Sequence, residues 1–125
     1  MNEKPLILAV DDEPSNLKLI AASLESDYKV ALAKSAALAE QFLKKKLPDL
    51  ILLDIKMPEK DGLTFAQELI ESNPGFSVPI VFITGLSESE AREAAMKLGA
   101  RGFAEKPLSV TALKKLVNSI FNAEE

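Results

Sequence analysis

The 125-residue sequence contains no cysteine and no histidine. Without cysteine the chain forms no disulfide, and without both residues it lacks the side chains that usually bind zinc and the softer metals. Any metal ion would therefore have to be a hard cation held by oxygen ligands.

Long apolar runs and long basic runs are also missing. No apolar stretch approaches the ~20 residues of a membrane-spanning helix. The first one, Leu6–Val10, is too short for the core of a signal peptide, and two aspartates stop it. The formal net charge of −4 argues against direct binding of nucleic acid. We therefore expect a cytoplasmic protein that contacts neither membranes nor nucleic acid.

The sequence instead alternates five short apolar runs with five amphipathic segments. Its length predicts one domain, residues 1–125, and the 47% apolar content is ordinary for a globular protein. The apolar runs, which we expect to be strands, are Leu6–Val10, Tyr28–Ala33, Leu50–Leu53, Val78–Ile83 and Gly102–Ala104. Apolar residues at helical spacing mark the other segments, as in Leu17, Ile20, Ala21 and Leu24.

This repeated strand–helix unit predicts an α/β fold, in which helices cover both faces of a parallel sheet. The first, third and fourth runs are apolar throughout, which is typical of central strands. If right-handed crossovers reverse direction after the second strand, the strand order is 2-1-3-4-5. That is the doubly wound, flavodoxin-like arrangement with five helices. Ser35, Ser87 and Ser109 are expected N-caps, and Gly99 an expected helix end.

Polar side chains follow four of the five apolar runs. Asp11 and Asp12 follow the first, Asp54 the third and Thr84 the fourth, while Lys106 comes just after the fifth. In a parallel sheet all carboxyl ends lie along one edge, and ligands bind there between the first and third strands. We therefore predict that these residues form one site.

Three carboxylates at one edge repel one another, and one lysine compensates them only in part. Two like charges ~4 Å apart cost roughly 4 kcal/mol at an effective dielectric constant near 20. Mg²⁺ is the natural cation for an oxygen-only site, and it leaves coordination positions for phosphate oxygens. Asp54, alone at the end of a central strand, is the best candidate for a nucleophile that forms an aspartyl phosphate. Asp61-Gly62 is expected to form a turn in the loop that follows.

The pattern resembles the receiver domain of bacterial two-component response regulators. The residues that carry the resemblance span nearly the whole chain in the expected order: Asp11-Asp12-Glu13-Pro14, Asp54, Met57-Pro58, Asp61-Gly62, Thr84-Gly85, Phe103 and Lys106-Pro107.

The resemblance implies that a histidine kinase or a phosphotransfer protein phosphorylates Asp54. It also implies that Asp12, Asp54 and the backbone carbonyl of Lys56 bind Mg²⁺, which Asp11 reaches through water. Lys106 would contact the phosphoryl group, and its peptide bond to Pro107 would be cis. Because the chain has no histidine, the phosphohistidine that donates the group must belong to another molecule.

The resemblance further implies a conformational switch. Thr84 would move towards the phosphate while Phe103 turns inward, which would remodel the surface of the fourth helix, fifth strand and fifth helix. Such a domain is no enzyme beyond its own phosphoryl transfer and dephosphorylation. It signals to an output domain or a separate protein, either alone or as a piece of a longer regulator. We expect a monomer or a weak, phosphorylation-dependent dimer.

Three other functions would fit part of this pattern. A haloacid-dehalogenase-type phosphatase would need a second acid two residues after Asp54, where this chain has Lys56. A flavin-binding module would need a glycine- and hydroxyl-rich loop after the first strand, where Asp11–Pro14 would repel phosphate. A degenerate receiver, used only as an interaction surface, would not need the complete set of acids, hydroxyl and lysine.

Overall fold

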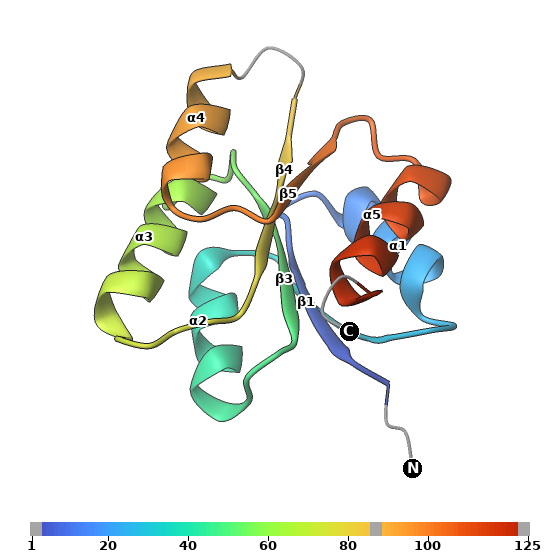
Figure 1. Ribbon diagram of the computed structural model, residues 1–125, viewed down its shortest axis with the longest axis horizontal. Coiled ribbons are helices and arrows are strands. Elements are labelled where there is room, and N and C mark those ends of the chain that lie inside the picture. The colour runs from blue at the N-terminus through green and yellow to red at the C-terminus, as the bar shows by residue number, and fades with distance from the viewer. Residues whose placement is uncertain (1–3, 86–88, 123–125) are drawn as a thin grey trace.

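The computed structural model describes residues 4–85 and 89–122, which form a parallel sheet covered by helices on both faces (Figure 1). The strands are β1 (Leu6–Val10), β2 (Lys29–Ala33), β3 (Leu50–Asp54), β4 (Ile80–Thr84) and β5 (Gly102–Glu105). The helices that alternate with them are α1 (Pro14–Leu24), α2 (Ala36–Lys45), α3 (Gly62–Ser72), α4 (Ser89–Lys97) and α5 (Val110–Asn122). The strand order is β2-β1-β3-β4-β5, so the predicted topology is confirmed.

The side chains of each strand alternate between two apolar layers, as a period of two residues requires. Ile7 and Ala9 of β1 belong to the layer under α1 and α5. Leu8 and Val10 belong to the layer under α2, α3 and α4. Strands β3 and β4 are buried at every position, whereas β2 is partly exposed along most of its length. The burial thus confirms that β3 and β4 are central strands and that β2 is an edge.

Two strands begin later than the sequence predicts. Strand β2 begins at Lys29, because the Tyr28 amide donates to the Leu24 carbonyl of α1 at 2.9 Å. The Tyr28 ring stacks on Phe121, with ring centroids 5.2 Å apart. Strand β4 begins at Ile80, because Pro79 has no backbone N–H to donate to a ladder. Strands β3, β4 and β5 extend one residue further than expected, so that Asp54, Thr84 and Glu105 are their last residues.

The helix boundaries follow local chemistry. The Ser35 hydroxyl accepts a hydrogen bond from the Leu38 amide at 3.1 Å, and Ser109 accepts one from the Ala112 amide at 3.3 Å. Both predicted N-caps are thereby confirmed, whereas Ser87 lies outside the described residues. Gly99, with φ of +93°, follows α4 as the predicted helix end. None of the helices in the described ranges has the length and apolar character of a membrane span.

Candidate functional site

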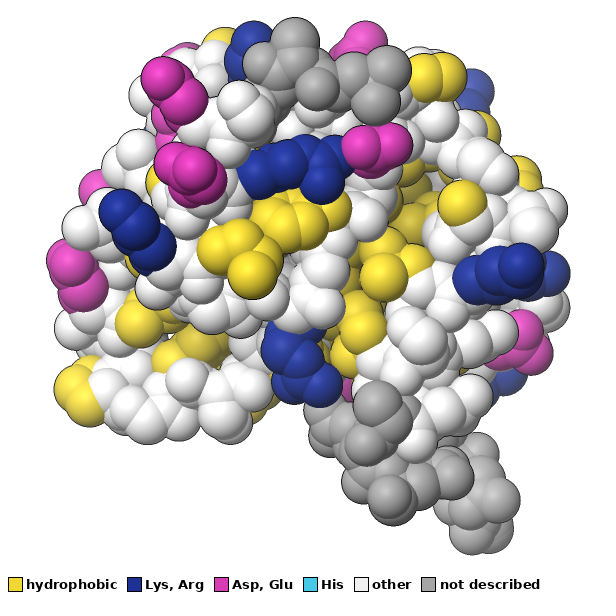
Figure 2. Space-filling model, turned by 45° about the horizontal axis from the view of Figure 1, so that its top comes forward, with side chains coloured by type: hydrophobic (Ala, Val, Ile, Leu, Met, Phe, Trp, Pro, Cys, Tyr) yellow, Lys and Arg dark blue, Asp and Glu magenta, His cyan; other side chains and the backbone are white. Residues whose placement is uncertain are grey.

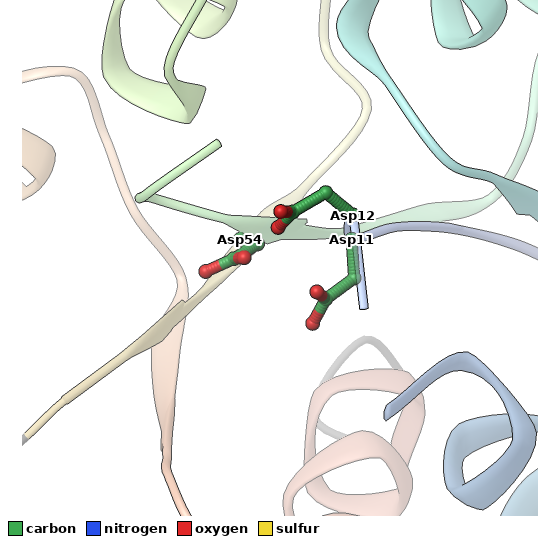
Figure 3. A group of neighbouring side chains, drawn as sticks. All are labelled: Asp11, Asp12 and Asp54. Atoms are coloured by element: carbon green, nitrogen blue, oxygen red, sulfur yellow. The ribbon is translucent and has the colours of Figure 1, made fainter. Parts of the chain in front are cut away.

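Three acidic side chains meet at the carboxyl end of the sheet (Figure 3). Asp11 and Asp12 follow β1, and Asp54 ends β3, which pairs directly with β1. Each of the three offers a carboxylate oxygen, and these oxygens lie within 4.8 Å of one another. Asp11 and Asp54 are buried, whereas Asp12 reaches solvent. The structure therefore brings together the acids that the sequence places at adjacent strand ends.

The two oxygens of Asp54 have different surroundings. The Lys106 ammonium lies 3.1 Å from Oδ1. Among the residues that the structure describes, none forms a hydrogen bond with Oδ2, although this atom is buried. A buried acceptor without a partner costs roughly 1–3 kcal/mol, and more when it is charged. Oδ2 therefore marks a place where a ligand that binds this oxygen would stabilise the site.

The pKa of Asp54 reflects its burial and the excess of negative charge in the site. Burial, and after it the charge of Asp11, raises the pKa of Asp54 from 3.8 to about 7, against the hydrogen bond and charge of Lys106. Burial lowers the pKa of Lys106, but its hydrogen bond to Asp54 and the surrounding carboxylates raise it by more, so the net shift is upward. Lys106 thus remains charged, but its charge does not hold the pKa of Asp54 in the range that is usual for a carboxyl group.

Asp11 is held in place by hydrogen bonds from the start of α1, the helix that follows it. The Asn16 side-chain amide donates hydrogen bonds of 3.0 Å to Asp11 Oδ2 and to Glu13 Oε1. The Glu13 backbone amide donates to Asp11 Oδ1 at 2.9 Å. Both Asp11 oxygens therefore already accept a hydrogen bond from the chain. Asn16 is not recognisable as a site residue from the sequence, because one amide in an amphipathic helix carries no signal until the helix start at Pro14 places it beside Asp11.

The loop after Asp54 is folded tightly against the end of β3. A Cβ atom at Gly62 would lie 2.2 Å from the Asp54 carbonyl oxygen, so only glycine fits there. The Gly62 amide donates to the Ile55 carbonyl at 2.8 Å. Asp61 is the N-cap of α3, since its side chain accepts from the Thr64 amide at 2.8 Å. The expected turn at Asp61-Gly62 is therefore a helix cap combined with a close backbone contact.

The same loop contains Lys56, two residues after Asp54, and then a tight turn. Further along, the Lys60 amide donates to the Pro58 carbonyl at 2.8 Å, and Glu59 between them has φ of 71°. This is the geometry of a γ-turn, which is rare for a residue with a side chain. The Lys60 side chain pairs with Glu68 of α3 and so ties the loop to that helix.

The remaining predicted residues lie on β4 and β5. Thr84 is 1% exposed, and its hydroxyl donates to the Gly85 carbonyl at 3.2 Å. Phe103 is half-buried and lies opposite Phe82 in the ladder, with ring centroids 6.5 Å apart. The Lys106–Pro107 peptide bond is cis, as the resemblance implied.

A parallel sheet in this order, with acids and a lysine at its carboxyl end, defines the class of receiver domains. A family model described as the response regulator receiver domain matches residues 7–118. The chain therefore belongs to the receiver domain family of response regulators. This assignment supports neither the phosphatase nor the flavin-binding alternative.

Similar proteins agree with this family. Response regulator Rre1 of Synechocystis is 35% identical over 127 residues, which cover 100% of this chain and 55% of that protein. A probable cyclic di-GMP phosphodiesterase of Vibrio cholerae is 34% identical over 113 residues, covering 90% of this chain and 26% of that protein. The chain thus spans between about a quarter and about half of the length of these relatives.

Solved structures of the family share the fold. The receiver domain of NtrX from Brucella abortus superposes with a TM-score of 0.80 at 30% identity, covering 94% of this chain and 96% of that one. The chemotaxis response regulator CheY4 of Vibrio cholerae gives a TM-score of 0.84 at 27% identity, covering 94% and 99%.

Proposed function

We propose that Asp54 accepts a phosphoryl group from a histidine kinase or a phosphotransfer protein, and that this modification switches a signalling surface of the domain. The observation that carries the proposal is the buried Asp54 carboxylate with one oxygen bound to Lys106 and the other without a partner in the described chain. An aspartate that accepts a phosphoryl group needs an oxygen that no other group of the chain occupies, beside a cation, and this arrangement supplies both.

The residues fit a bound Mg²⁺. The donors are all oxygen atoms, they lie within 4.8 Å of one another, and they carry more negative charge than Lys106 compensates. Asp12, Asp54 and the Lys56 backbone carbonyl would hold the ion directly. Asp11 would act through water, since both of its oxygens already accept hydrogen bonds. When bound, Mg²⁺ would neutralise charge on the carboxylates and on the phosphoryl oxygens.

The chain's own residues would perform the transfer mainly by positioning. An Asp54 oxygen forms the bond to phosphorus while the bond to the donor's imidazole nitrogen breaks, and that nitrogen takes up a proton. The Lys106 ammonium, already 3.1 Å from Asp54 Oδ1, would bind a phosphoryl oxygen and compensate its charge. The Thr84 hydroxyl, at the end of the next strand, would donate a hydrogen bond to another phosphoryl oxygen.

The switch would use the same two strands. As Thr84 moves towards the phosphoryl group, Phe103 would turn inward, and the surface of α4, β5 and α5 would change. We further propose that residues 1–125 act in the cytoplasm as one receiver domain, a monomer or a weak phosphorylation-dependent dimer. Its target would be an output domain or a separate protein.

Phosphorylation by a small acyl phosphate tests the proposal. In the presence of Mg²⁺ and acetyl phosphate, intact-mass analysis should show one added phosphoryl group on the wild type and none on Asp54→Asn. Asp49→Asn, the same substitution at the opposite end of the sheet, should label as the wild type does. Equal labelling of wild type and Asp54→Asn would reject Asp54. An unlabelled wild type would favour a receiver used only as an interaction surface.

A further inference from the structure

Arg92 of α4 contacts two side chains of β5. Its guanidinium group forms an ion pair with the Glu105 carboxylate. It also lies over the Phe103 ring, with Cζ 5.0 Å from the centroid. Phe103 and Glu105 are two residues apart in one strand, so their side chains project from the same face of the sheet. Arg92 therefore binds both of them from above that face.

Phe103 lies between a hydrophobic and a cationic neighbour. The Phe82 ring packs on it from β4, and the Arg92 guanidinium covers it from α4. The Arg92 side chain is only 31% exposed, so its charge is partly removed from water. Partial desolvation strengthens a cation–π contact, and the ion pair with Glu105 holds the guanidinium in place over the ring. Any movement of Phe103 out of this position loses the contact with Arg92.

The ring also faces open space. A hollow of about 410 Å³ lies along β5 and the start of α5, and its walls include Arg92, Phe103, Leu108 and Leu116. On the molecular face that Figure 2 presents, hydrophobic side chains are exposed beside basic and acidic ones. Packing alone therefore does not enclose Phe103, which leaves the guanidinium as a specific contact that selects its position.

The three residues connect to the phosphorylation site through the backbone. Glu105 is opposite Thr84 in the β4–β5 ladder. The next residue, Lys106, contacts Asp54 at 3.1 Å. A displacement of Lys106 or Thr84 would therefore reach Glu105 directly, and through it Arg92.

We propose that Arg92 is a positioning residue that holds Phe103 in the unswitched position, so that phosphorylation must release the ring from the guanidinium. This inference rests on the proposed function of Asp54. Because coupling between two sites is reciprocal, a contact present only in the unswitched form weakens the binding of any phosphoryl analogue by the same factor. Removing the contact should therefore strengthen that binding.

Beryllofluoride with Mg²⁺, an analogue of the phosphoryl group, provides the measurement. Arg92→Gln should bind it about 3- to 10-fold more tightly than the wild type, the range that one partly desolvated cation–π contact gives. NMR of the Phe103 ring in the free protein should show a shift towards the beryllofluoride-bound position. Lys97→Gln removes one charge from an exposed site on the same helix and should change neither reading.

Two further variants separate positioning from a merely structural contact. Arg92→Lys keeps the charge but loses the flat stacking surface, so its affinity should fall between those of wild type and Arg92→Gln. In a Phe103→Leu background the ring is absent, and Arg92→Gln should then change beryllofluoride affinity by less than twofold. An equal effect of Arg92→Gln with and without the ring would overturn the inference.

The outcomes distinguish the two proposals. A wild type that binds beryllofluoride, beside an Arg92→Gln variant with the same affinity and the same ring position, overturns the role of Arg92 alone. Weaker binding by Arg92→Gln does so as well. A wild type that binds no beryllofluoride and is not labelled on Asp54 overturns the proposed function, and with it the inference that depends on it.

Discussion

The two ends of the parallel sheet are formed by the same strands but differ in how completely their polar side chains are hydrogen-bonded. At the carboxyl end Asp11, Asp54 and Thr84 are buried, and Asp54 keeps an oxygen without a partner in the described chain. At the amino end the Tyr28 hydroxyl donates to Asn118 while its ring stacks on Phe121. One end is therefore built for stability, whereas the other holds charge that destabilises the fold until a ligand compensates it.

The loops at the two ends show the same contrast in their glycines. Gly62→Ala should be the most damaging of the changes considered, because its Cβ would lie 2.2 Å from the Asp54 carbonyl oxygen. The backbone at position 62 and the backbone at Asp54 would have to move apart, which should lower the free energy of unfolding by roughly 3 kcal/mol or more. Gly75→Ala, at the amino end with φ of +87° and open space around it, should lose only about 1 kcal/mol. Equal losses in urea denaturation would contradict the close contact.

The buried charge of Asp54 should itself be measurable as lost stability. Asp54→Asn should raise the free energy of unfolding at pH 8 without divalent cations by about 2 to 4 kcal/mol. The sign follows from the raised pKa of Asp54: the folded protein holds the proton up to about pH 7, the unfolded one only to about 3.8. Wild-type stability should therefore fall as pH rises from about 4 to 7, relative to the variant.

Denaturant unfolding of both proteins across that pH range measures this difference. The advantage of Asp54→Asn should shrink as the pH falls towards 4 and disappear below about pH 3, where the wild-type side chain is protonated in both states. Asp49→Asn is the matched control at the amino end, where the exposed carboxylate accepts a hydrogen bond from the Leu6 amide at 2.8 Å. It should give no stabilisation. An Asp54→Asn variant less stable than wild type at pH 8 would contradict the account.

A small effect is expected for the hydrogen bond at the amino end. Tyr28→Phe keeps the stacking on Phe121 but loses the hydrogen bond to Asn118, which should lower the free energy of unfolding by about 1 kcal/mol. Phosphoryl labelling of Asp54 should not change, because the site lies at the other end of the sheet. Reduced labelling in a folded Tyr28→Phe variant would show that the two ends are coupled.

The sequence predicts the elements that depend on local pattern and on topology. Apolar runs mark the strands, and the rule that parallel strands share a carboxyl edge brings Asp11, Asp12 and Asp54 together before any coordinates are known. The predicted positions of the strand ends were less accurate. Val78 and Pro79 look like strand residues by hydrophobicity, yet Pro79 has no N–H to donate and contributes only its carbonyl, which accepts from the Ile51 amide at 3.0 Å.

Contacts between distant elements could not be predicted in this way. The requirement for glycine at position 62 comes from the approach of one backbone segment to the Asp54 carbonyl, which the dipeptide Asp61-Gly62 does not reveal. The position of Arg92 over Phe103 depends on how α4 packs on β5, and a charged residue in a helix looks like solvent-facing surface. Such contacts are properties of tertiary packing.

The stability of the protein under titration with Mg²⁺ tests the central claim most directly. If the carboxyl end gathers excess negative charge to bind this ion, Mg²⁺ should raise the wild-type unfolding temperature in a saturable way. Asp12→Ala should be at least as stable as wild type without the ion and should gain little from it, while Asp49→Asn should respond as wild type does. An equal gain in wild type and Asp12→Ala would contradict the account.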